Sequence, residues 1–263
     1  TPSTTNITTG LLPNFLSVGG KTRQNDLDVA FTISIQPGAA TDHALTTGSM
    51  NQRQAFMTIG DASWGSVKVG KDLGIYASDA ILSDMTLLGV GAGASAVGNT
   101  TLGRIGYGYQ YADWKSQIAY TSPNFAGFSF TAGVTQPWSA GRAVPSTGLT
   151  DNATTVYQNQ TEPAFEAKAS YSFSVDAVSG KVWASGITQN VDVSTTENHT
   201  AKAGDLGINL NAAGFGLTGY YGEGQGTGML GQMNDATAVR KNKDWYAQAT
   251  YALPGVGTKV GVS

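Results

Sequence analysis

The sequence predicts an all-β fold, a transmembrane antiparallel up-and-down β-barrel, and three observations carry this prediction. Apolar and polar residues alternate at period two in many segments. The connections between these segments alternate between short turns and long loops. Only 13% of the 263 residues are charged while 35 are glycine, a composition typical of many strands joined by polar turns.

The alternation is clearest at residues 26–36, where one face carries Leu27, Val29, Phe31, Ile33 and Ile35. It returns around Phe128 and Phe130 and across residues 163–175. Helical spacing fits none of these segments, and a buried parallel strand would be apolar on both faces. We predict strands at 14–21, 26–36, 50–60, 65–72, 105–121, 125–136, 163–175, 181–191, 201–211, 214–222, 243–253 and 257–263.

The connections indicate where the two ends of these strands lie. Short turns rich in Gly, Pro, Asn or Asp alternate with long connections at 37–49, 73–104, 137–162, 192–200 and 223–242. Outer-membrane barrels have short periplasmic turns and long outer loops, whereas a soluble sandwich has no reason for this alternation. Closure also pairs every backbone N–H and C=O group, as lipid requires. We therefore expect one barrel domain over residues 1–263.

The composition excludes several other classes. No run approaches the roughly 18 apolar residues of a spanning helix. The net charge of -3 leaves no basic surplus for nucleic acid, and the absence of cysteine removes disulfides, thiolate metal sites and cysteine nucleophiles. Aromatic residues near predicted strand ends suit the two membrane interfaces; they include Tyr107, Tyr109, Tyr111, Trp114, Tyr120, Tyr220, Tyr221, Trp245, Tyr246 and Tyr251.

Three segments resemble the Gram-negative general diffusion porin family, particularly its proteobacterial members. They are Trp64 to Asp72 (WGSVKVGKD), Ser78 to Gly89 (SDAILSDMTLLG) and Tyr120 to Phe130 (YTSPNFAGFSF). The resemblance covers residues 14–136 well and the remainder only as a rhythm of strands and turns. It implies a homotrimer of 16-stranded barrels in the outer membrane that pass ions and small hydrophilic solutes by diffusion, with membrane lipid as the surrounding partner.

Two features depart from this family pattern. We predict 12 strands rather than 16, and the chain stops at Ser263 within a strand, without the terminal aromatic residue of such barrels. We therefore expect a chain that is incomplete at both ends. A true 12-stranded barrel is the alternative.

The resemblance also implies that the third outer loop folds into the barrel and forms a charged pore constriction. Here that segment lies between the strands predicted at 65–72 and 105–121, and its carboxylates are Asp79 and Asp84. Its apolar residues, among them Ile81 and Leu82, favour packing against an inner wall. Opposed charges across a water-filled constriction sort ions by their charge.

Candidates for the basic side of the constriction come from neighbouring segments. Alternation with the outward-facing Val69 places the side chain of Lys68 on the inward face. Lys71 takes the place of an arginine that is usual in the family, but the same alternation places it on the outward face with Val69. Arg104, Lys115 and Arg53 are further candidates, and each of these charges has a simpler interpretation as a solvated residue with no special role.

Motifs for chemistry are weak, and we predict no enzyme, cofactor or metal site. Residues 89–94 fit a G-x-G-x-x-A dinucleotide fingerprint, but no βαβ pattern surrounds them. The two histidines, His43 and His199, lie far apart in predicted loops. The alternative to a porin is a secreted or surface β-sandwich binding module, such as a lectin or adhesin, which would pack its apolar face against a second sheet.

Overall fold

A computed structural model gives the fold over residues 10, 14–37, 50–88, 101–139, 141–144, 154–157, 159–228, 232–233, 235 and 240–263. His43 and the glycine-rich residues 89–94 lie outside these ranges. Within the described residues one antiparallel sheet has 12 strands in the order β1-β2-β3-β4-β5-β6-β9-β10-β11-β12-β13-β14. Each strand pairs with its neighbours along the chain, apart from the β6–β9 pairing that passes over β7 and β8.

The strands of the sheet are β1 (Leu16–Gln24), β2 (Leu27–Pro37), β3 (Met50–Asp61), β4 (Gly65–Leu73), β5 (Trp114–Thr121), β6 (Phe128–Thr135), β9 (Ala164–Val175), β10 (Val178–Asp192), β11 (Asn198–Ala212), β12 (Phe215–Gln225), β13 (Lys241–Ala252) and β14 (Lys259–Val262). Two short helices follow β4: α1 (Ser78–Ser83) and the 3-10 helix η1 (Met85–Leu88). No helix in the described ranges is long and apolar enough to cross a membrane.

The short turns have the backbone geometry that tight hairpins need. Asn25 and Asp26 join β1 to β2, and Ala213 and Gly214 join β11 to β12, all four with positive φ. Two successive residues with positive φ match the right-handed twist of the flanking strands. These turns fix the register, so side chains keep the same face from strand to strand.

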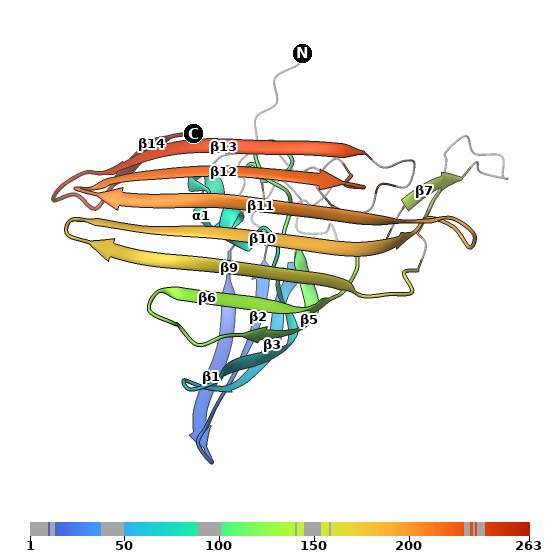
Figure 1. The fold of residues 1–263 in the computed structure, drawn as a ribbon, viewed down its shortest axis with the longest axis horizontal. Helices are drawn as coiled ribbons and strands as arrows, with labels where there is room; N and C mark the ends of the chain where they lie inside the picture. Colours follow the sequence, from blue (N-terminus) through green and yellow to red (C-terminus); the bar gives the residue numbers. More distant parts are fainter. Residues whose placement is uncertain are drawn as a thin grey trace.

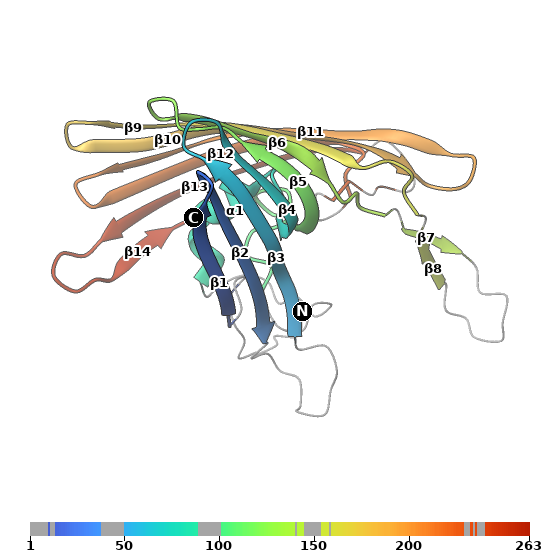
Figure 2. The same ribbon diagram turned by 90° about the horizontal axis from the view of Figure 1, so that it is seen from below.

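The sheet bends into a trough (Figures 1 and 2). Strands β9 to β13 form one wall, β1 to β5 turn away from it, and α1 lies on the concave side. Strands β1 and β14 are the two edges, and in the described residues they do not pair with each other. The predicted antiparallel up-and-down architecture is confirmed, with the barrel open between these edges.

One predicted strand is wrong over its first half. Residues 105–113 lie in turns and bridges, and β5 begins only at Trp114. Gly103 and Gly106 have positive φ, and Ile105 and Tyr109 are buried. Alternating Gly and Tyr residues imitate a strand pattern, but the glycines permit a compact loop that buries its apolar side chains.

The long connections also differ from the prediction. Residues 141–144 (β7) and 154–157 (β8) form a separate two-stranded hairpin inside the predicted loop 137–162. The connection from β10 to β11 is only residues 193–197, because both strands extend further than predicted. The alternation of polar residues there was too weak to mark the strand ends.

Several aromatic residues predicted at the membrane interfaces lie on the concave side instead. Tyr109, Tyr220 and Tyr246 are nearly fully buried in the core between the sheet and the segment after β4. The rings of Tyr220 and Tyr246 stack with centroids 5.5 Å apart, and Tyr109 meets Tyr246 edge to face at 5.7 Å. Trp245 and Tyr221 are exposed on the convex side, as expected for interface residues.

Candidate functional site: the lumen-facing segment after β4

The two faces of the sheet have different chemistry. On β9 the residues Glu166, Lys168 and Ser170 face the concave side, while Phe165 and Tyr171 are exposed on the convex side. The same division holds on β2, where Phe31 and Ile33 are exposed on the convex side. A polar inner face and an apolar outer face are the arrangement of a barrel with a water-filled interior.

Residues 74–88, which we call the inner segment, lie against the polar concave face. Ser78 to Ile81, in helix α1, are buried. Strand β13 binds this segment: the Tyr246 hydroxyl donates to the Ala80 carbonyl at 3.0 Å, and the Gln248 amide donates to the Ser83 carbonyl at 2.7 Å. Gln248 also accepts from the Met85 backbone N–H at 2.9 Å. The inner segment is therefore fixed by side chains of the sheet.

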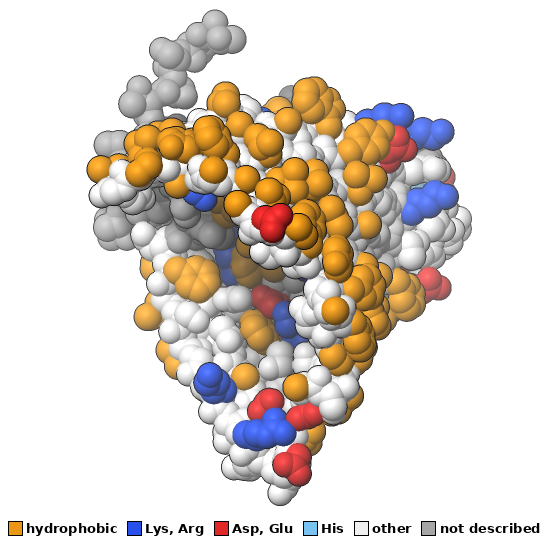
Figure 3. Space-filling view, turned by 60° about the vertical axis from the view of Figure 1, so that its left-hand side comes forward, with side chains coloured by type: hydrophobic (Ala, Val, Ile, Leu, Met, Phe, Trp, Pro, Cys, Tyr) orange, Lys and Arg blue, Asp and Glu red, His pale blue; other side chains and the backbone are white. Residues whose placement is uncertain are grey.

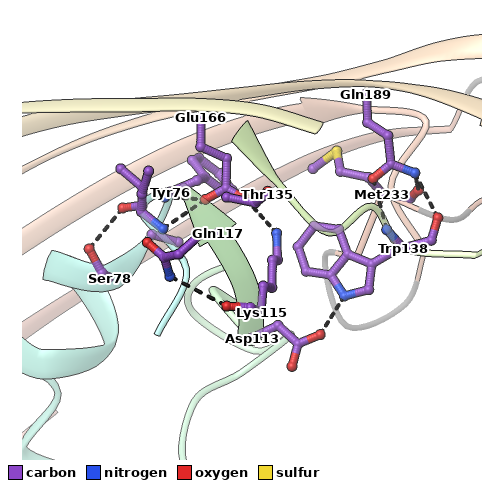
Figure 4. Close-up of polar contacts among 12 residues, drawn as sticks. Tyr76, Ser78, Asp113, Lys115, Gln117, Thr135, Trp138, Glu166, Gln189 and Met233 are labelled. Atoms are coloured by element: carbon purple, nitrogen blue, oxygen red, sulfur yellow. Dashed lines mark hydrogen bonds and ion pairs between the residues drawn. The ribbon is translucent and has the colours of Figure 1, made fainter. Parts of the chain in front are cut away.

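Glu166 on β9 fixes the start of the inner segment (Figure 4). One carboxylate oxygen accepts from the backbone N–H groups of Ile75 and Tyr76, both at 2.8 Å. The other accepts from the Thr135 hydroxyl at 2.7 Å and from the ammonium of Lys115. Both Lys115 and Glu166 are almost fully buried, so this ion pair is stable only because the remaining donors also saturate the carboxylate.

The aromatic ring of Trp138 covers Lys115 on its other side. The Lys115 ammonium lies 3.5 Å from the ring centroid, a cation–π contact. The indole N–H donates to Asp113 at 2.7 Å, and the backbone N–H of Trp138 donates to Gln189 at 3.0 Å. Figure 4 shows this chain of contacts running from Glu166 to Gln189 along the concave face. The lysine is thereby enclosed between a carboxylate and an indole.

Asp79 lies between two lysines of the wall. The ammonium of Lys168 is 3.1 Å from one carboxylate oxygen, and Lys181 on β10 donates to the other oxygen. Lys168 also donates to the Ser78 hydroxyl at 2.9 Å. Burial raises the pKa of the Asp79 carboxyl, but the two lysines outweigh it and hold the pKa below its usual value of 3.8. The site therefore contains one ionised carboxylate and two ammonium groups.

Asp84 has a different environment, because the loop itself surrounds it. Its carboxylate accepts from the Thr86 backbone N–H at 2.8 Å, from the Tyr109 hydroxyl at 2.7 Å and from the Arg104 backbone N–H at 3.3 Å. Burial and this carboxylate raise the pKa of Tyr109 well above its ordinary value, so Tyr109 stays a donor. Asp84 ties residues 84–86 to residues 104–109.

The predicted basic residues are not gathered in one place. Lys68 lies on the concave face and pairs with Asp72. Lys71 lies on the convex face, because its register partners Ala55 and Ser116 are exposed there. The half-buried Arg104 contributes its backbone to Asp84, and Lys115 pairs with Glu166. Of these two predicted residues, Lys68 therefore lies on the lumen side of the sheet and Lys71 does not.

Arg53 lies at a β-bulge, where the register of β2 against β3 shifts between Ser34 and Ile35. The bulge turns its side chain inward, out of the parity of the exposed residues Ala55 and Met57. Its guanidinium lies 5.6 Å from the ring centroid of Trp114.

Lys168 and Lys181 were missed in the sequence analysis, although both have inward parity. Only the register of β9 against β10, which pairs Ser185 with Lys168 and Lys181 with Ser172, places them together. Asp79, which contacts both lysines, precedes Lys168 by 89 residues and Lys181 by 102 residues in the chain. No local pattern contains this information.

A cavity of about 390 Å³ remains between the inner segment and the wall. Figure 3 looks toward this hollow, with charged side chains of both signs inside it. The charged residues that line it are Lys68, Asp72 and Lys168, and the apolar ones include Leu82 and Trp114. In the part of the chain that the structure describes, no group of three His, Cys, Asp or Glu side chains could hold a metal ion.

A single antiparallel up-and-down sheet with a polar inner face and an apolar outer face defines the class of membrane β-barrels. A sequence model described as "Gram-negative porin" matches residues 3–263. The chain therefore belongs to the Gram-negative porin family, whose members lie in the outer membrane as channels, and it is not an enzyme. Comparison with curated proteins finds no match.

Solved structures agree with this fold. An anion-selective porin from Comamonas acidovorans superposes with a TM-score of 0.59 at 15% identity, over 94% of this chain and 66% of that chain. The outer membrane channel DcaP of Acinetobacter baumannii gives 0.63 at 15% identity, over 91% and 62%. The chain thus spans slightly less than two thirds of their length. A β-sandwich is not supported, since the 12 strands form a single continuous sheet.

Proposed function

We propose that the protein forms a water-filled channel for passive diffusion of ions and small hydrophilic solutes across the outer membrane. The supporting observation is the inner segment, bonded to a polar concave face while the convex face is apolar. Residues 1–263 would be part of a single barrel domain, surrounded by outer-membrane lipid.

We propose further that the inner segment forms the pore constriction. Asp79, Lys168 and Lys181 would form one charged side, and Lys68 with Asp72 the opposite side, because Lys68, Asp72 and Lys168 line the same cavity. Asp84, Arg104, Lys115 and Arg53 would hold the segment and the wall in shape. Lys71 would lie outside the constriction, on the convex face.

Planar-bilayer conductance of the full-length protein tests both proposals. Asp79→Asn should shift the reversal potential in a salt gradient toward anion selectivity, and Lys168→Gln with Lys181→Gln should shift it toward cations. Both shifts should shrink at high salt, since the screening length falls to about 3 Å at 1 M. Because the pKa of Asp79 is depressed, its contribution should persist above pH 3.8 and disappear only in more acidic solution.

The matched control is Lys71→Gln, which removes a charge from the convex face. It should leave the reversal potential unchanged. Conductance with unaltered selectivity in the Asp79 and lysine variants would disprove the constriction and leave the channel intact. A monodisperse protein that needs no detergent would disprove the channel itself.

We also propose a homotrimer, as the family resemblance implies. The convex face has an apolar groove of about 820 Å³ across β4, β5, β6, β9, β10 and the edge of β11 at Ala203, lined by residues such as Ile118 and Val134. A neighbouring subunit that filled this groove would bury apolar surface and exclude poorly packed lipid. We assign the subunit contact to this groove.

A further inference from the structure

Three lysines lie on the convex face at the loop end of β11 and β13. Lys202, Lys241 and Lys243 are all exposed. Residues two apart on a strand share a face, so Lys202 shares its face with Leu206, and Lys243 with Trp245. Figure 3 shows blue side chains gathered beside a red one toward the right-hand edge, next to hydrophobic side chains. Outward lysines are unusual on a surface that meets hydrocarbon.

Their position along the strands places them at the edge of the apolar band. Trp245 is 71% exposed, and Tyr251 lies on the same face toward the turn end. Lys241 is ten residues from Tyr251 (251 − 241), and a tilted strand crosses the hydrocarbon core in about nine to eleven residues. With Tyr251 at the interface on the turn side, Lys241 would be level with the headgroups of the opposite leaflet, and the flexible side chain of Lys243 would extend to the same level.

The local charge is positive. Glu223 pairs with Lys243 at 3.0 Å and accepts from the Tyr221 hydroxyl. In the described part of the chain, no salt bridge neutralises Lys202 or Lys241. Both are register partners of Gln225, so two strand spacings, about 10 Å, separate their backbones. A groove of about 380 Å³ lies between them. One phosphate group fits within reach of both ammonium groups.

We propose that this groove binds the phosphate-bearing headgroup of an outer-leaflet lipid whose headgroup carries a net negative charge. The ammonium groups of Lys202 and Lys241 and the amide of Gln225 donate to the phosphate oxygens. The acyl chains lie along the exposed side chains of Leu206, Tyr221 and Trp245. An amphipathic ligand is required because the charged groove opens directly onto this apolar surface. The inference rests on the proposed placement of the convex face in lipid.

Native mass spectrometry of the purified full-length protein in a non-ionic detergent tests this site. Phosphatidylglycerol should be retained and phosphatidylcholine, whose headgroup carries no net charge, should be lost. Lys202→Gln with Lys241→Gln should weaken phosphatidylglycerol binding by about fivefold for each lysine removed. Glu223→Gln removes a negative charge and should strengthen it. Lys259→Gln, near the turn end of the sheet, is the matched control and should have no effect.

Two results would contradict the lipid site. Equal retention of both lipids, or unchanged binding in the double lysine variant, would overturn the proposal. Displacement of the lipid by millimolar inorganic phosphate would assign the groove to a free anion instead. Loss of heat-modifiable gel mobility would show that the double variant fails to fold. In that case Glu223→Gln tests the proposal, because phosphatidylglycerol binding that is no stronger than in the unaltered protein would contradict the role of the positive charge. Channel conductance measured on the same variants separates this site from the proposed function.

Discussion

Glu166 shows at the residue scale what a buried carboxylate needs on the inward face of the sheet. Four donors saturate it, two from the backbone of the inner segment and two from the side chains of Lys115 and Thr135. The carboxylate therefore both neutralises a buried lysine and fixes the backbone where β4 leaves the wall. Removing its charge would affect both roles at once.

Glu166→Gln should destabilise the protein strongly. The substitution leaves the Lys115 ammonium buried without a counter-charge, and breaking a buried pair in this way costs about 3–5 kcal/mol. The midpoint of heat-modified gel mobility should fall accordingly. Glu162→Gln changes an exposed glutamate four residues earlier and should leave the midpoint unaltered. Similar midpoints for both variants would contradict the role given to Glu166.

The sequence could indicate the inward parity of Lys68, Glu166 and Lys168, but not their partners. Asp79 meets Lys181 across 102 residues of chain, and that meeting depends on the register of several strands. Arg53 shows a second limit, since a one-residue bulge reverses the face of its side chain. Alternation predicts a face only while the pairing stays regular.

The strands themselves were predictable at the element scale, because each has one apolar face. The boundaries failed where glycine weakened that pattern, as in the segment from Ile105 to Asp113, which resembles a strand but packs as a loop. The β7–β8 hairpin was missed because its strands are only four residues long. A strand that short has too few alternating positions to be distinguished from a polar loop.

Adjacent residues on β6 should respond in opposite ways to charge. Phe130 is exposed on the convex face, whereas Ser129 lies on the concave face opposite Ser170. Phe130→Lys should cost about 2–4 kcal/mol if it lies near the bilayer midplane, while Ser129→Lys should be tolerated. Refolding titrations into lipid vesicles measure both. Equal losses for the two variants would disprove the assignment of the faces.

The whole molecule is a trough whose curvature no single strand encodes. Alternation predicts which side chains face inward and which face outward, but the bend between the β1–β5 and β9–β13 walls (Figure 2) is a property of all the paired strands together. The subunit contact is equally absent from local patterns, since lipid and a second barrel both favour apolar side chains. The apolar groove on the convex face is the contact that we propose for a second barrel.

The lack of cysteine in the chain makes the subunit contact directly testable. Ile118→Cys places a single thiol in the apolar groove, and Ile208→Cys places one on a distant part of the same convex face. A short bifunctional maleimide should cross-link the Ile118 variant into dimers in mild detergent, the largest product that one thiol per subunit allows, and the Ile208 variant should stay monomeric. Monomers in both cases would exclude the groove as a subunit contact.

The contacts of the inner segment impose an order on assembly. The hydrogen bond of Ile75 needs Glu166, which lies 91 residues later in the chain. The hydrogen bond of Ala80 needs Tyr246, which lies 166 residues later. Contacts of such long sequence separation form late, because the intervening chain must be ordered first. We therefore expect the wall to form before this segment docks. In the proposed channel the passage would be widest during that interval, and its narrowing would be the last step of folding.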